Sequence, residues 1–121
     1  MGGLLSFYLV TYHPDVFGAC GCESTHFPLP EAAVAEHFEG VDHPANPDET
    51  PYVIRDIKSG LKVPPGARYY FDYGTEGLDA EYGPTHEAVR QWLLAQGRVE
   101  GTDFVIREYA GAEHNLSLIH I

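Results

Sequence analysis

Two polar loops carry the side chains of this sequence that are best suited to acid–base chemistry. The loop over residues 74–83 contains Glu76 and Asp79, and the loop over residues 110–115 contains His114. An imidazole takes up and releases a proton near neutral pH, which makes histidine the most frequent general base in enzymes. The bland alternative is that these three side chains are solvated loop groups without partners.

The seven histidines and two cysteines also raise the question of a metal site. Cys20, Cys22 and His26 lie close together in the sequence, and a strand would turn both cysteines to the same face. Their spacing matches no established zinc motif, and His37 and His43 are neighbours only across a loop. We expect buried thiols and scattered histidines, with a divalent metal such as zinc as the alternative. A bound metal would activate water for ester hydrolysis without a serine.

No disulfide is expected between Cys20 and Cys22. Alternate residues on one face of a strand lie far apart for this bond, and the ring that they would close is small. The first residues, 1–5, lack the basic region of a signal peptide, and no apolar run is long enough to span a membrane. We therefore expect a cytoplasmic protein.

Helices and strands alternate in the predicted secondary structure. Helices are expected over 3–12, 31–39, 51–60 and 84–96, and strands over 16–23, 68–73 and 104–109. This alternation predicts an α/β fold with a short, mainly parallel sheet and flanking crossover helices. The helix over 3–12 is apolar on nearly every side, so it is expected to contact protein all round.

Composition narrows the classes of partner. The chain has 121 residues, which is the length of one domain or part of one. Asp and Glu number 18 against 7 Lys and Arg, for a net charge of -11. So negative a surface repels phosphate backbones and acidic headgroups, and it disfavours nucleic acid and membrane surfaces as partners.

Three segments together resemble the C-terminal half of an α/β-hydrolase. Residues 1–3, Met-Gly-Gly before an apolar helix, resemble the segment directly after the nucleophile in this fold. Residues 70–76, YFDYGTE, resemble the strand and loop that deliver the catalytic acid, and residues 111–115, GAEHN, resemble the loop of the catalytic histidine. The similarity is greatest to the esterase branch that includes enterochelin-esterase-like and S-formylglutathione-hydrolase-like enzymes.

This resemblance implies a hydrolase of small esters. His114 would be the general base, and Asp79, or alternatively Glu76, would be the acid that orients it. The family's nucleophile is missing, since no serine of the chain stands in a Gly-x-Ser-x-Gly context. Residual activity would then come from His114 activating water, from a group of another copy, or from a metal.

The resemblance also predicts the organisation of the chain. Residues 1–115 would be a truncated α/β-hydrolase domain, cut just after the nucleophile. Residues 116–121, LSLIHI, leave the family pattern and resemble a translated sequencing-adapter tail, which predicts a truncated reading frame from fragmented DNA.

A truncated sheet would leave large apolar side chains uncovered. Exposing each one costs about 1.5–3 kcal/mol relative to burying it, and a domain has only about 5–15 kcal/mol of stability. Self-association, most simply as a dimer, would supply the missing cover. A non-enzymatic self-assembling fragment is therefore the alternative from another functional class.

Overall fold

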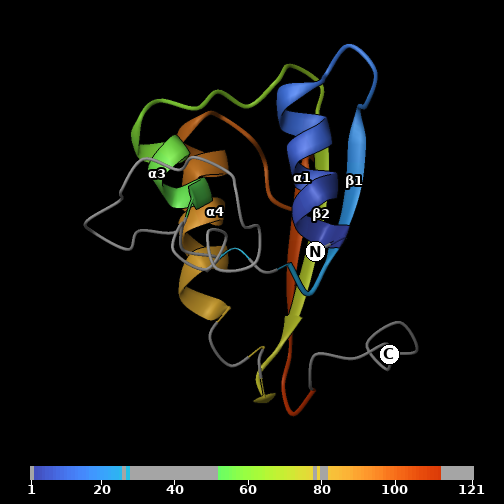
Figure 1. The fold of residues 1–121 in the computed structure, drawn as a ribbon, viewed down its shortest axis with the longest axis vertical. Coiled ribbons are helices and arrows are strands. Elements are labelled where there is room, and N and C mark those ends of the chain that lie inside the picture. The colour runs from blue at the N-terminus through green and yellow to red at the C-terminus, as the bar shows by residue number, and fades with distance from the viewer. Residues whose placement is uncertain (1, 26, 28–51, 78, 80–81, 113–121) are drawn as a thin grey trace, which may run out of the picture.

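A computed structural model describes residues 2–25, 27, 52–77, 79 and 82–112 of the chain (Figure 1). Three helices and three strands occur in these residues. In chain order they are α1 (Gly2–Tyr12), β1 (Ala19–Glu23), α3 (Tyr52–Lys58), β2 (Arg68–Gly74), α4 (Gly83–Ala95) and β3 (Phe104–Tyr109).

The three strands form one parallel sheet in the order β1-β2-β3. In register, Cys22 lies beside Phe71, and Phe71 lies beside Ile106. Parallel neighbours need a crossover connection, and α4 provides it between β2 and β3. The expected α/β class with a short parallel sheet and flanking helices is confirmed at this coarse level.

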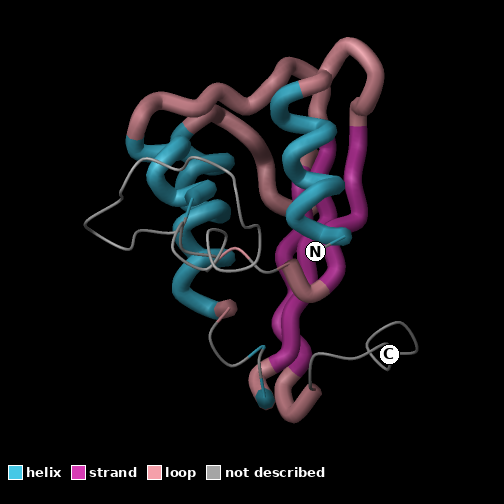
Figure 2. Tube along the Cα trace, viewed as in Figure 1, coloured by secondary structure: helices cyan, strands magenta, loops and turns pink. Residues whose placement is uncertain are grey.

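The core is a cluster of aromatic rings between the sheet and the helices. Phe7 of α1 lies at its centre, with ring centroids 5.4 Å from Phe27, 5.8 Å from Tyr69 and 5.9 Å from Trp92. Phe7 therefore contacts both the central strand β2 and helix α4, so α1 and α4 pack on the same face of the sheet. Figure 2 shows the helices gathered on one side of the strands.

No described helix covers the opposite face of the sheet. The alternate strand positions place Tyr70 and Val105 on this face, both half-buried, and Arg68 and Arg107, both exposed. Within the described strands, β1 and β3 each pair along one side only. The described part of the sheet is thus layered with helices on a single face.

Helix α1 corrects one expectation from the sequence. It buries Phe7, Val10 and Thr11, but the side chains of Leu5 and Tyr8 are 57% and 46% exposed. A helix packed on one face of a sheet has an outer side, and the described residues do not cover it. The expectation of protein on all sides of α1 is therefore wrong for this part of the chain.

Most other predicted elements agree with the structure to within two residues at each end. The exception is the strand expected over 16–23, which begins at Ala19. The backbone N–H groups of Val16 and Phe17 donate to the carbonyl of His13, so these residues form a turn after α1 instead of extending β1. The helix expected over 31–39 lies outside the described residues.

Among the described residues, no helix combines the length and the apolar character needed to cross a membrane.

Adjacent leucines on α4 test the position of the core. Leu93 is fully buried, whereas Leu94 is 43% exposed. We expect Leu93→Ala to lower the free energy of unfolding by about 2–5 kcal/mol, because it leaves a cavity in the core. The matched change Leu94→Ala should cost less than about 1 kcal/mol. Urea denaturation measures both, and equal losses would contradict this packing of α4 on the sheet.

Candidate active site

The candidate site lies where the parallel strands end. Ser24 directly follows β1, Asp79 follows β2 after a short loop, and residues 110–112 follow β3. The carboxyl ends of parallel strands meet at one edge of a sheet, which is where open α/β sheets usually bind ligands. The loops after all three strands therefore converge on one edge.

The Asp79 carboxylate is the buried polar centre of this edge, with the residue only 1% exposed. Its Oδ2 atom accepts a hydrogen bond from the backbone N–H of Gly74 at 2.6 Å and another from the hydroxyl of Ser24 at 3.0 Å. Hydrogen bonds to an ionised carboxylate are shorter and stronger than neutral ones. The two donors fix the position of the carboxylate relative to the ends of β1 and β2.

The other carboxylate considered as the acid, Glu76, has an exposed side chain. Its backbone N–H, by contrast, donates to the carbonyl of Ala112 at 3.0 Å. The structure thus distinguishes the two carboxylates by their surroundings. Asp79 is buried and held by two donors, and Glu76 takes part in the loop through its backbone.

Two loops are fastened together beside Asp79. The Ala112 carbonyl accepts from the backbone N–H groups of Thr75 and Glu76, each at 3.0 Å, and the Gly111 N–H donates to the Thr75 hydroxyl at 2.8 Å. A Cβ atom built on Gly74 would lie 2.1 Å from the Ala112 oxygen. Only glycine permits this approach of the segment after β3 to the end of β2.

His114 lies outside the described residues, two positions after Ala112. Two residues of extended chain span at most about 7 Å between Cα atoms. The covalent chain therefore limits how far His114 can lie from the loop that also carries Asp79.

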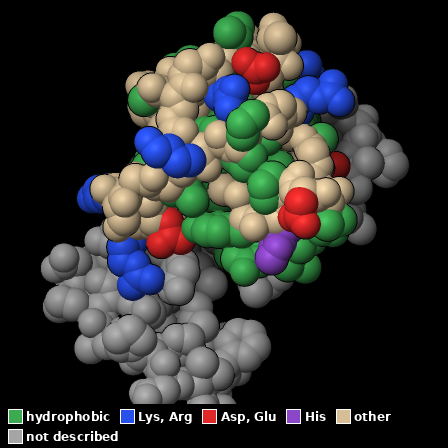
Figure 3. Space-filling model, turned by 90° about the horizontal axis from the view of Figure 1, so that it is seen from above, with side chains coloured by type: hydrophobic (Ala, Val, Ile, Leu, Met, Phe, Trp, Pro, Cys, Tyr) green, Lys and Arg blue, Asp and Glu red, His purple; other side chains and the backbone are tan. Residues whose placement is uncertain are grey.

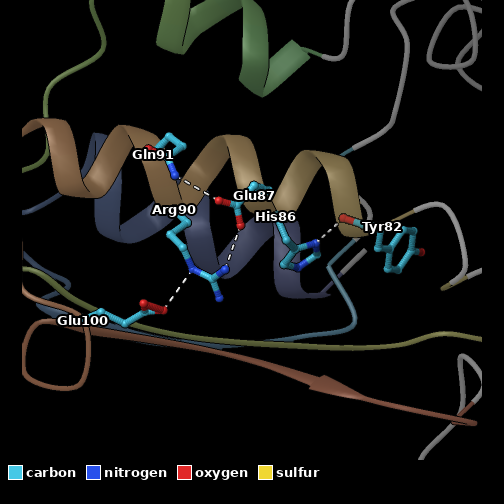
Figure 4. A network of polar contacts seen from close by, with 6 residues as sticks. All are labelled: Tyr82, His86, Glu87, Arg90, Gln91 and Glu100. Carbon is cyan, nitrogen blue, oxygen red and sulfur yellow. Dashed lines mark hydrogen bonds and ion pairs between the residues drawn. The ribbon is translucent and has the colours of Figure 1, made fainter.

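A second histidine, His86 on α4, is fully buried behind this edge. Its ring lies against Tyr73, with centroids 4.5 Å apart, and against Phe27, with centroids 5.0 Å apart. Nδ1 lies 2.9 Å from the carbonyl oxygen of Tyr82 (Figure 4), so Nδ1 carries the proton and Nε2 is left as an acceptor. Nε2 has no hydrogen-bond partner among the described residues.

Burial lowers the pKa of His86 to about 4, despite the opposing effects of the Tyr82 carbonyl and the Asp79 charge. His86 is therefore neutral at physiological pH. It holds the start of α4 through Tyr82, whose N–H in turn donates to the carbonyl of Asp79. Through these two bonds α4 anchors the loop that carries Asp79.

The exposed side of α4 carries an ion-pair network around Arg90 (Figure 4). Its guanidinium contacts Glu87 at 2.7 Å and Glu100 at 2.9 Å, and Gln91 also donates to Glu87. These groups are accessible to solvent, so the pairs contribute little to stability. They lie on the outer side of α4 and take no part in the edge around Asp79.

Sequence reasoning missed two contributors to this edge, Ser24 and His86. Ser24 is the one described non-glycine residue with a positive φ, 43°. Such strained backbone often occurs at functional sites, but no local pattern in the sequence marks it. His86 stands three residues before Val89 and seven before Leu93, so the helical spacing of the core could have revealed its burial.

The metal hypothesis has no structural support in the described residues. Within them, no group of three or more His, Cys, Asp and Glu side chains is arranged to hold a metal ion. Cys20 and Cys22 do face the same way, but His26, His37 and His43 lie outside the described residues.

Protonation of His86 should make stability depend on pH. The folded pKa is about 4 against an ordinary 6.5, so the unfolded chain binds the proton more tightly between these values. His86 should therefore cost roughly 3 kcal/mol of unfolding free energy as pH falls from about 7 to about 4. Urea denaturation at several pH values should show a shallower loss for His86→Phe, and an unchanged slope for the exposed control His13→Gln. A wild-type slope in His86→Phe would contradict the neutral buried imidazole.

Comparison with known proteins gives no match: no family model, curated protein or solved structure is significantly similar to this chain. The resemblance to the esterase family therefore stays an expectation from the sequence, and the function has to be argued from the geometry of the site.

Proposed function

We propose that this chain hydrolyses small esters with Asp79 and His114 as its acid–base pair. The observation that supports this is the buried Asp79 carboxylate, held by Gly74 and Ser24 in the loop to which the segment before His114 is hydrogen-bonded. A carboxylate fixed in this way can orient an imidazole and stabilise the imidazolium that forms when the base takes a proton.

In the proposed reaction, water is the nucleophile. The His114 imidazole takes a proton from water as the water oxygen attacks the ester carbonyl, and it later returns the proton to the leaving alkoxide. Asp79 stays ionised and keeps the imidazole in place. No serine of the chain stands in the context of a nucleophile elbow, so this route requires only groups present in the sequence.

The pair of carboxylates gives a matched test of the proposal. With p-nitrophenyl acetate as substrate, we expect His114→Ala and Asp79→Asn each to lower kcat/KM at least about tenfold, because each removes part of general-base catalysis. Glu76→Gln should change kcat/KM less than twofold, because its exposed side chain lies outside the proposed pair. Circular dichroism and urea denaturation check that the Asp79→Asn protein is folded.

Three outcomes would contradict this mechanism. Loss of activity with a chelator, restored by zinc, would establish the metal-dependent alternative. Labelling of the chain by a serine-directed phosphonate would show that a serine, not water, is the nucleophile. Wild-type turnover no faster than that of His114→Ala would leave the non-enzymatic self-assembling fragment as the better description.

We also propose that two copies associate through an outer stripe, defined as the exposed side of α1 with the turn after it. Of the seven large hydrophobic side chains exposed in the described residues, five belong to this stripe. They are Leu5, Tyr8, Tyr12, Val16 and Phe17. Figure 3 shows hydrophobic side chains grouped between charged ones when the molecule is seen from above. A two-fold axis would let the stripe of one copy cover that of the other.

Light scattering after size exclusion tests this association over a range of concentrations. We expect a wild-type dimer that Leu5→Glu converts to monomer, because the added carboxylate would be buried unpaired in the interface. Leu94→Glu, at a comparably exposed leucine on α4, should remain dimeric. A wild-type protein that is monomeric at every concentration would refute the interface, as would an unchanged mass for Leu5→Glu.

A further inference from the structure

The two cysteines of the chain lie side by side on the edge strand β1. Their Sγ atoms are 2.7 Å apart, closer than two thiols approach without interacting, and neither is in a disulfide. The sequence-based argument that strand geometry keeps these sulfurs too far apart is therefore wrong. With a rise of about 3.3 Å per residue, their Cα atoms lie roughly 6.6 Å apart, within the range of about 4.4–6.8 Å seen in disulfides.

We propose that Cys20 and Cys22 form a redox-active dithiol that reduces low-molecular-weight disulfides. This proposal does not rest on the ester hydrolysis proposed above, because it uses neither Asp79 nor His114. It rests on the sulfur–sulfur contact, on the different accessibility of the two thiols, and on the glycine between them.

The two thiols differ in accessibility, which assigns their roles. Cys20 is half-buried on a strand whose outer edge no described strand covers, so a small disulfide can approach it. Cys22 is fully buried in the core beside Phe71. The hydrogen bond to Cys20 and burial both raise the pKa of the Cys22 thiol. Cys20 is therefore the attacking thiol and Cys22 the resolving one.

The reaction consists of two exchanges. The Cys20 thiolate attacks one sulfur of the disulfide RSSR, so a Cys20–SR bond forms, the RS–SR bond breaks, and the released RS⁻ takes up a proton. Cys22 then loses its proton and attacks Cys20 Sγ, releasing the second RS⁻, which is also protonated. Two electrons pass from the dithiol to RSSR, and the products are a Cys20–Cys22 disulfide and two RSH molecules.

The small ring makes this disulfide easy to reduce again. Strained disulfides have more oxidising potentials than structural ones and are the labile ones in proteins. Gly21 lets the backbone adapt to the ring, and it is exposed with free space around it. The geometry thus fits a reversible redox pair better than a permanent cross-link, which also suits a reducing compartment.

The test uses the full-length protein equilibrated in glutathione buffers of increasing oxidation, then acid-quenched, alkylated and weighed by mass spectrometry. We expect wild type to lose two hydrogens and both alkylation sites without accumulating a glutathione adduct. Cys22→Ser should accumulate one glutathione on Cys20. Cys20→Ser should react with oxidised glutathione at least about tenfold more slowly than Cys22→Ser, because Cys22 is buried.

The substitution Gly21→Ala gives a control that keeps the core residues. A Cβ atom at Gly21 would meet nothing within 4 Å, so the reduced protein should fold as before. The stiffer backbone should strain the ring, so half-oxidation should need a more oxidising glutathione ratio than in wild type.

Each contrary result is decisive. The proposal fails if wild type stays fully reduced in the most oxidising buffer, or if it stops at the glutathione adduct on Cys20. It also fails if the oxidised product is a dimer linked between two copies. If Cys22→Ser does not fold, Cys22→Ala serves for the same adduct measurement.

Discussion

The close approach of the Ala112 carbonyl to Gly74 is the constraint on which the candidate site depends. It brings the segment after β3 against the end of β2, and the Thr75 and Glu76 amides satisfy that carbonyl. The Gly74 amide is meanwhile free to donate to Asp79, because parallel pairing ends at this residue. One glycine thus admits a neighbouring loop and also positions the buried carboxylate. Any larger residue would separate the two loops.

The buried carboxylate is tolerated in this fold because the groups around it are themselves fixed. Its donors are a strand-end amide and the Ser24 hydroxyl, and its own carbonyl is held by the Tyr82 amide. His86 holds Tyr82 from within the aromatic core. The polar edge is therefore anchored to the same ring cluster that binds α1 and α4 to the sheet, so stability of the core and order at the edge are coupled.

Much of the fold could be predicted from the sequence, and the site only in part. The strand Phe104–Tyr109 and the helix around Trp92 have strong local patterns, and the structure has both. The apolar surroundings of α1 were overestimated, because hydropathy reports what a helix could bury and not what the described chain supplies. Asp79 and Glu76 are equivalent by composition. What distinguishes them is burial, and that depends on contacts with Ser24 and Gly74, which are distant or unmarked in the sequence.

Strand β1 connects the two activities proposed for this chain. Cys22 and Ser24 are separated by one residue, so the strand that carries the dithiol also supplies a hydrogen-bond donor to Asp79. Closing a small ring between Cys20 and Cys22 must change the local backbone, since their sulfurs are still farther apart than the about 2.05 Å of a disulfide. The Ser24 amide is itself bonded to the carbonyl and carboxylate of Asp72 on β2, which resists that change. Oxidation of the dithiol would therefore either strain β1 or shift Ser24. In the second case the redox state of the cysteines would alter how firmly the Asp79 carboxylate is held.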